Sequence, residues 1–151
     1  MENDRALHII EDELEALKKR IIDNHIRARQ VASGRTIRSL KVQMDDNGGI
    51  LWGRQAFGVL ETGRGPGKVP KGFYQKILEW IHDKGIQVEK PKTFAYFVAK
   101  KIKKEGTELY RKGGINDIYS KEIPKTVNNI SNRIFTLLEV EVESININAS
   151  R

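Results

Sequence analysis

The feature that most constrains this chain is a glycine- and proline-rich segment in its middle. Seven such residues fall within residues 58–72, namely Gly58, Gly63, Gly65, Gly67, Gly72, Pro66 and Pro70. Glycine costs conformational entropy inside regular elements and proline cannot donate a backbone hydrogen bond, so a helix or strand past residue 62 is disfavoured. We therefore predict a short apolar approach over residues 56–61 and an extended loop over residues 62–72.

The residues before this loop predict one long helix and one hairpin. Apolar residues recur every three or four positions from Leu7 to Ile26, which is the spacing of a helix with one apolar face. Such a helix of roughly thirty residues is ~45 Å long. We expect part of its apolar face to pack on a neighbouring subunit; the alternative is that it lies across its own sheet. Alternation over residues 36–44, a turn over residues 45–49 and a return strand that begins with residues 50–52 predict an antiparallel hairpin.

Three further helices are predicted after the loop, over residues 73–85, 93–106 and 123–137. In the second of these the apolar spacing predicts a buried stripe made of Phe94, Phe97, Val98 and Ile102. The chain then alternates valine with glutamate from residue 139, and Ile145 and Ile147 have the opposite parity, so we predict a terminal strand with a bulge near residues 143–144. The expected fold is a single α+β domain over residues 1–151, with the long first helix and the three further helices packed on an antiparallel sheet.

The composition and motifs argue against catalysis. The chain has 151 residues and no cysteine, which excludes a disulfide scaffold, a thiolate metal site and a cysteine nucleophile. Residues 63–68 superficially resemble a phosphate-binding loop, but Val69 and Pro70 stand where that motif requires a hydroxyl and a helix. The three histidines lie far apart without paired carboxylates, so we predict no catalytic residue, metal or cofactor. No apolar run approaches the ~18 residues that span a bilayer, and the polar, acidic N-terminus predicts no secretory signal and no membrane partner.

Positive charge is concentrated in one part of the chain. The net charge is +7, and residues 64–112 contain thirteen Lys or Arg against five Asp or Glu. Such a block indicates a phosphate-bearing or acidic partner, or alternatively a solvated lysine-rich helix. The candidates for a DNA-facing surface are Lys100, Lys101, Lys103 and Lys104. A nonspecific DNA-binding accessory protein is accordingly a second hypothesis for the function.

The central segment, with its flanks, resembles a known family. Residues 57–67 read FGVLETGRGPG, residues 77–86 read ILEWIHDKGI, and residues 94–107 begin with FAY and end with EGT. This order of motifs, together with ASGRT at residues 32–36, is similar to that of tail-completion and neck proteins of long-tailed bacteriophages. The resemblance covers roughly residues 30–120.

The resemblance implies a structural subunit with no catalytic residue. We expect a homo-oligomeric ring at the head–tail neck or tail end of a virion, in contact with portal or connector and tail proteins and with packaged DNA passing nonspecifically. The residues expected at the subunit interface are Glu61, Thr62, Arg64, Pro66, Lys68 and Pro70. A phage-encoded enzyme is a third alternative.

Overall fold

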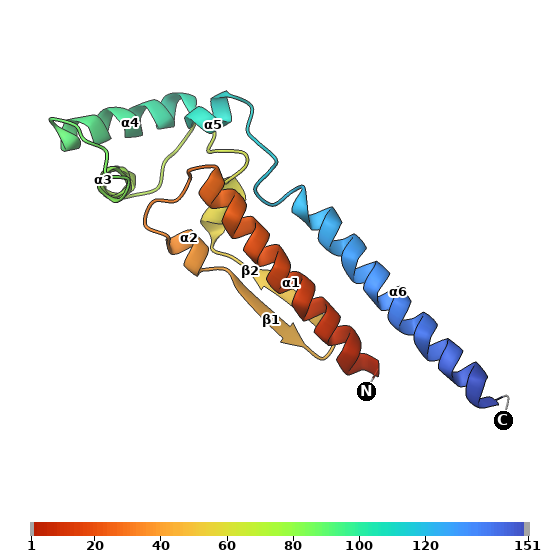
Figure 1. Cartoon of the computed structure of the whole chain (residues 1–151). Coiled ribbons are helices and arrows are strands. Elements are labelled where there is room, and N and C mark those ends of the chain that lie inside the picture. The colour runs from red at the N-terminus through yellow and green to blue at the C-terminus, as the bar shows by residue number, and fades with distance from the viewer. Residues whose placement is uncertain (1, 150–151) are drawn as a thin grey trace.

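Two long helices lie side by side and dominate the computed structural model, which describes residues 2–149 (Figure 1). The architecture is α+β, with a two-stranded antiparallel sheet beside the first helix. In chain order the elements are α1 (Glu2–Arg27), α2 (Arg35–Arg38), β1 (Lys41–Asp45), β2 (Gly48–Trp52), the 3-10 helix η1 (Gln55–Val59), α3 (Phe73–Asp83), α4 (Pro91–Glu105), α5 (Glu108–Arg111) and α6 (Glu122–Ala149).

The main core lies between α1 and the hairpin. Strand β1 pairs with β2 from Lys41 opposite Trp52 to Asp45 opposite Gly48, leaving a two-residue turn. The carboxylate of Asp45 accepts a 2.8 Å hydrogen bond from the amide of Asn47, which closes this turn. Leu17 and Ile21 of α1 pack with Leu40 and Ile118 to form the buried cluster. The apolar face of α1 therefore lies across its own hairpin in this part of the helix.

The first helix and the first strand of the hairpin are shorter than predicted, and the return strand begins two residues earlier, at Gly48. Helix α1 ends at Arg27, and Arg29 adopts a left-handed φ of 57°, which stops helical propagation. The residues predicted to begin the first strand form the short helix α2 instead, and Ser39 then donates its hydroxyl hydrogen bond to the carbonyl of Thr36. The strand itself begins only at Lys41.

The predicted C-terminal strand is wrong, because helix α6 continues without a break to Ala149. Leu138, Val142 and Ile145 follow one another at steps of four and three positions, which is the spacing of one helical face. A step of three changes the odd–even parity, so the pattern that indicated a bulge in a strand is explained by a helix. Because the described residues form no third strand, the sheet is small, and the three further helices do not pack mainly on it as predicted. Helix α6 packs on α1, and α3 and α4 make their main contacts with each other.

Helices α3 and α4 form a separate pair at one end of the molecule (Figure 1). Pro91 occupies the first turn of α4, where its missing amide costs nothing, and Gly106 ends the helix with a φ of 82°. Ile81 of α3 and Ala95 of α4 are buried. The predicted burial of Phe94 and Phe97 is wrong, since these residues are 38% and 60% exposed. The buried side of α4 is formed by smaller residues around Ala95, and Phe97 lies on the opposite face.

Candidate assembly surfaces

The central loop, residues 61–70, is hydrogen-bonded to a later segment of its own chain. The carbonyl of Glu61 accepts a 2.8 Å hydrogen bond from the amide of Ile115, and the carbonyl of Arg64 accepts one of 2.8 Å from Thr107. The amide of Gly67 donates to the carbonyl of Lys103 over 2.9 Å. The loop has no regular secondary structure, as predicted, but it joins the α1–hairpin body to the segment between α4 and α6.

Glycine is required where these two segments meet. Gly106 and Gly114 have φ angles of 82° and 77°, which side-chain-bearing residues rarely adopt. A Cβ atom on Gly106 would lie 2.7 Å from the carbonyl oxygen of Arg64, and one on Gly114 would lie 2.7 Å from the carbonyl oxygen of Glu61. The two backbones therefore approach each other more closely than any side chain allows.

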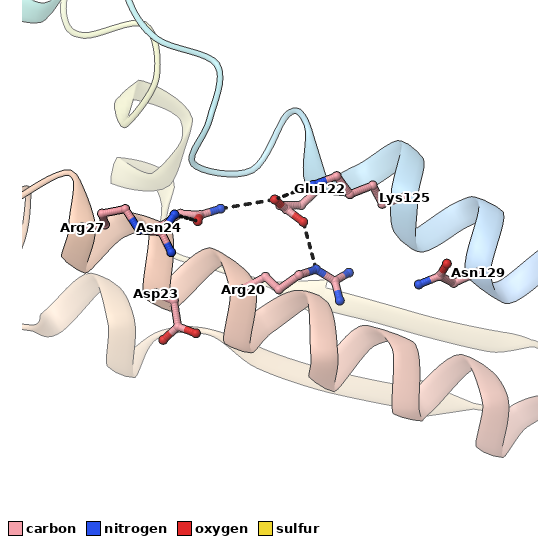
Figure 2. A pocket seen from close by; sticks show the side chains of 7 residues that line it. All are labelled: Arg20, Asp23, Asn24, Arg27, Glu122, Lys125 and Asn129. Atoms are coloured by element: carbon pink, nitrogen blue, oxygen red, sulfur yellow. Dashed lines mark hydrogen bonds and ion pairs between the residues drawn. The ribbon is translucent and has the colours of Figure 1, made fainter.

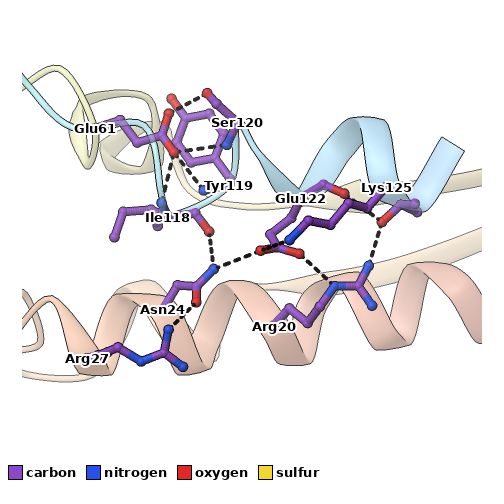
Figure 3. Close-up of polar contacts among 10 residues, drawn as sticks. Arg20, Asn24, Arg27, Glu61, Ile118, Tyr119, Ser120, Glu122 and Lys125 are labelled. Atoms are coloured by element: carbon purple, nitrogen blue, oxygen red, sulfur yellow. Dashed lines mark hydrogen bonds and ion pairs between the residues drawn. The ribbon is translucent and has the colours of Figure 1, made fainter. Parts of the chain in front are cut away.

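Glu61 fastens the loop to the beginning of α6 (Figure 3). Its Oε1 atom accepts hydrogen bonds from the amides of Ile118, Tyr119 and Ser120 at 3.0, 2.7 and 2.9 Å, and Oε2 accepts one from the Ser120 hydroxyl. Burial alone would raise the pKa of Glu61, but these four hydrogen bonds outweigh it and hold the pKa below its ordinary value. The carboxylate is thus ionised and fully engaged within the chain.

The six predicted interface residues differ in what they offer to a partner. Glu61 is only 3% exposed, and its carboxylate is committed to its own chain, so it presents no surface to another subunit. The guanidinium of Arg64 donates to the carbonyl of Lys68 over 2.8 Å and lies 5.4 Å from the ring centroid of Phe73. The members of the set that remain exposed are Thr62, Pro66, Lys68 and Pro70.

Where the C-terminal half of α1 meets the N-terminal half of α6, the contact between the two helices is largely polar. The Nε atom of Arg20 lies 2.9 Å from Oε2 of Glu122, and its Nη2 atom donates to the Thr126 hydroxyl over 2.7 Å. Asn24 donates to the carbonyl of Ile118 over 3.1 Å and bonds Glu122 as well. Burial would raise the pKa of Glu122, but hydrogen bonds and positive charge from Lys125, Asn24 and Arg20 lower it overall.

A polar groove between the two helices is lined by Arg20, Asp23, Asn24, Arg27, Glu122, Lys125 and Asn129 (Figure 2). The groove is open, and the carboxylate of Glu122 at its centre is already held by side chains of both helices. Further along, Arg133 of α6 bonds Glu13 and Asp12 of α1, each over 3.0 Å, so ion pairing continues past the groove. The groove therefore serves to join the helices.

The opposite side of α6 is apolar and uncovered. We name this side the α6 stripe; its residues are 47–64% exposed and comprise Ile123, Val127, Phe135, Leu138, Val142 and Ile145. The α1-binding residues Glu122, Thr126 and Arg133 occupy a different face of the helix, because helical neighbours lie three and four positions apart. The α6 stripe therefore faces solvent, while Glu122, Thr126 and Arg133 contact α1.

The chain exposes far more surface than a compact monomer of its size. Its accessible area is 10928 Å². A compact monomer of 17.3 kDa exposes ~7,800 Å². Among the described residues, six apolar side chains are buried and seventeen large ones are exposed. Exposed apolar surface on this scale marks sites of protein association.

The predicted basic candidates lie together on an exposed surface of α4. Lys100, Lys101, Lys103 and Lys104 are all exposed. Tyr96 and Phe97 precede them on the helix, 55% and 60% exposed, with ring centroids 5.6 Å apart in an edge-on contact. Sequence reasoning found the lysines but placed Phe97 in the core, so it missed that the surface is both aromatic and basic.

Comparison of the chain with protein-family models, with curated proteins and with solved structures finds no match. In the part of the chain that the structure describes, no helix combines the length and apolar character needed to cross a bilayer. The described residues also include no group of three or more His, Cys, Asp or Glu side chains placed to hold a metal ion.

Proposed function

We propose that this chain is a structural subunit of a bacteriophage particle, forming a homo-oligomeric ring at the head–tail neck or completing the tail. The observation that carries the assembly role is the α6 stripe, which runs along a 28-residue helix and has no cover within the described chain. The phage assignment draws on the resemblance of residues 57–67 and their flanks to tail-completion and neck proteins. The portal or connector and the tail proteins of the same particle are the proposed neighbours.

The surface area supports more than one interface per subunit. A standard interface removes ~800 Å² from each partner. The excess over a compact monomer, ~3,000 Å², is larger than two such interfaces require. A subunit of a closed ring has two neighbours and uses a different patch for each. An elongated subunit with surplus apolar surface has enough area for two interfaces and can use a different patch for each.

The direct test is to find the chain in particles. Virions purified from a lysate would be analysed by mass spectrometry of their proteins and by cryo-microscopy of the neck and tail end. The proposal expects this chain in the particle, in a ring of fixed copy number. A chain that is abundant in the lysate, absent from virions and monomeric at all concentrations would refute it.

The exposed lysines of α4 favour a second candidate, a nonspecific DNA-binding accessory protein. Neutralising phosphates with Lys or Arg gives an affinity that falls steeply with salt. This candidate expects the isolated monomer to bind duplex DNA, and it expects this binding to weaken when Lys100, Lys101, Lys103 and Lys104 are changed to Glu. A gel-shift titration at two salt concentrations separates the two candidates.

A further inference from the structure

We infer that the aromatic–basic face of α4 binds the acidic C-terminal half of the α6 stripe of a second copy of this chain. The contact is head-to-tail, because the two patches are different surfaces of one subunit. The inference rests on the proposed oligomer and goes further by naming both patches and the chemistry that matches them.

The α4 patch combines aromatic rings with cations. Phe97, Lys100 and Lys104 are spaced by three and four residues, so they share one face of the helix, and Tyr96 adjoins Lys100 at the same spacing. All four are exposed. Within the described part of the chain neither of these two lysines forms an ion pair, so their charges are free for an acidic partner.

The α6 patch combines aliphatic side chains with anions. Leu138, Val142 and Ile145 share one face and are 52%, 56% and 64% exposed. Glu139 adjoins Val142 at the edge of this face, Glu143 lies one turn beyond Glu139, and both glutamates are exposed. Neither glutamate is ion-paired with another described residue, whereas the neighbouring Glu141 lies 3.8 Å from Arg5 of α1. The patch therefore presents uncompensated negative charge beside apolar surface.

The two patches match each other in charge and in apolar character. An opposite-sign pairing steers association and sets orientation, and the apolar side chains supply buried area. The chain cannot make this contact with itself, because α4 and the C-terminal end of α6 lie at opposite ends of the molecule (Figure 1). Only another copy brings the two together, and repeating the contact from copy to copy builds a ring or a filament.

The test uses charge reversal in the full-length chain. One variant carries Lys100→Glu and Lys104→Glu, a second carries Glu139→Lys and Glu143→Lys, and a third carries all four changes. A control carries Lys19→Glu and Lys41→Glu at exposed positions on α1 and β1, which lower the net charge by as much as the first variant does. Size-exclusion chromatography with light scattering over a concentration series measures the oligomer, and circular dichroism checks that each variant is folded.

The expected result is an oligomer for the wild type and the control. Each double variant should dissociate at concentrations at least about tenfold higher, because like charges then face each other. The four-fold variant should recover most of the lost affinity, since its reversed charges again match. Rescue is the decisive readout, because a variant that merely misfolds would not be rescued by a second pair of changes.

Two outcomes would overturn the inference. The first is an unchanged oligomer in both double variants. The second is that the Lys100→Glu, Lys104→Glu variant keeps its oligomer but no longer binds a 30-base-pair duplex. This result would assign the α4 patch to DNA. Virion mass spectrometry separates this question from the proposed function: rescue without incorporation refutes only the phage role, and incorporation without a charge effect refutes only the pairing.

Discussion

The Oε1 atom of Glu61 accepts a 2.9 Å hydrogen bond from the backbone amide of Ser120, a residue 59 positions later in the chain. Ser120 lies just before α6, and the same carboxylate also binds the two preceding amides. The start of the longest helix in the structure is thereby attached to the central loop by one buried anion. A charged acceptor makes stronger hydrogen bonds than a neutral one.

Replacing Glu61 should destabilise the fold. Glu61→Ala removes the acceptor of four hydrogen bonds and leaves amides without a partner, so we expect a loss of about 3 kcal/mol in the free energy of unfolding. Glu61→Gln keeps a neutral acceptor and should cost less. Urea denaturation followed by circular dichroism measures both, with the exposed Glu89→Gln as control. Equal midpoints for Glu61→Ala and wild type would contradict the role of the carboxylate.

The same carboxylate should make stability depend on acidity. Its pKa in the folded state lies below the ordinary value of a glutamate, so the folded state favours the ionised form. Its contribution is complete above the unfolded pKa and is lost as the pH falls through the folded pKa. The stability difference between wild type and Glu61→Gln should therefore be constant near neutral pH and shrink below about pH 4.5. Urea midpoints for both proteins from pH 7 to pH 3 check this, and a difference that grows on acidification would be inconsistent.

Alanine should not be tolerated where the loop meets the later segment. Gly106→Ala and Gly114→Ala each force a left-handed φ on alanine and place its Cβ 2.7 Å from a backbone oxygen. We expect each to lower the free energy of unfolding by about 2 kcal/mol or more. Gly58→Ala is the matched control, because nothing lies within 4 Å of its added Cβ. Thermal melts of the three variants should separate the control from the other two.

Removing apolar surface from the α6 stripe should weaken assembly and spare the fold. Phe135→Ser with Val142→Ser takes away two side chains that are 62% and 56% exposed and contribute little to the core. We expect the oligomer to dissociate at about tenfold higher concentration, with a monomer melting temperature close to wild type. The control is Ile50→Ser on β2, 47% exposed and outside the stripe. An equal loss of assembly in the control would show that the effect is not specific to α6.

Local periodicity was sufficient to predict α1, α3, α4 and the first half of α6. The spacing within residues 7–26, 73–85 and 93–106 gave helices close to α1, α3 and α4, because an apolar face repeats with the helical turn. The glycine and proline content, and not the periodicity, predicted the loop without regular structure between η1 and α3. Periodicity failed after residue 139, where alternating valine and glutamate fit a strand locally although the residues continue an existing helix.

The sites were harder to predict because they depend on distant partners. No sequence pattern connects Glu61 with residues 118–120, so its role in attaching α6 could not be foreseen. Phe97 has helical spacing relative to its apolar neighbours, yet the pair α3–α4 buries the smaller Ala95 and leaves Phe97 outside. An apolar stripe shows only that a helix has two faces; which face its own chain covers is decided by tertiary packing.

The hydrogen bonds between the central loop and residues 103–120 connect the C-terminal end of α4 with the beginning of α6. In an assembly whose contacts lie on α4 and α6, the angle between these two helices determines the rotation that relates one copy to the next. It therefore determines how many copies close the ring. Gly106, Gly114 and Glu61, which hold these segments together, would then determine the circumference of the ring. A loosened joint would yield circles of mixed size or open spirals instead of one species.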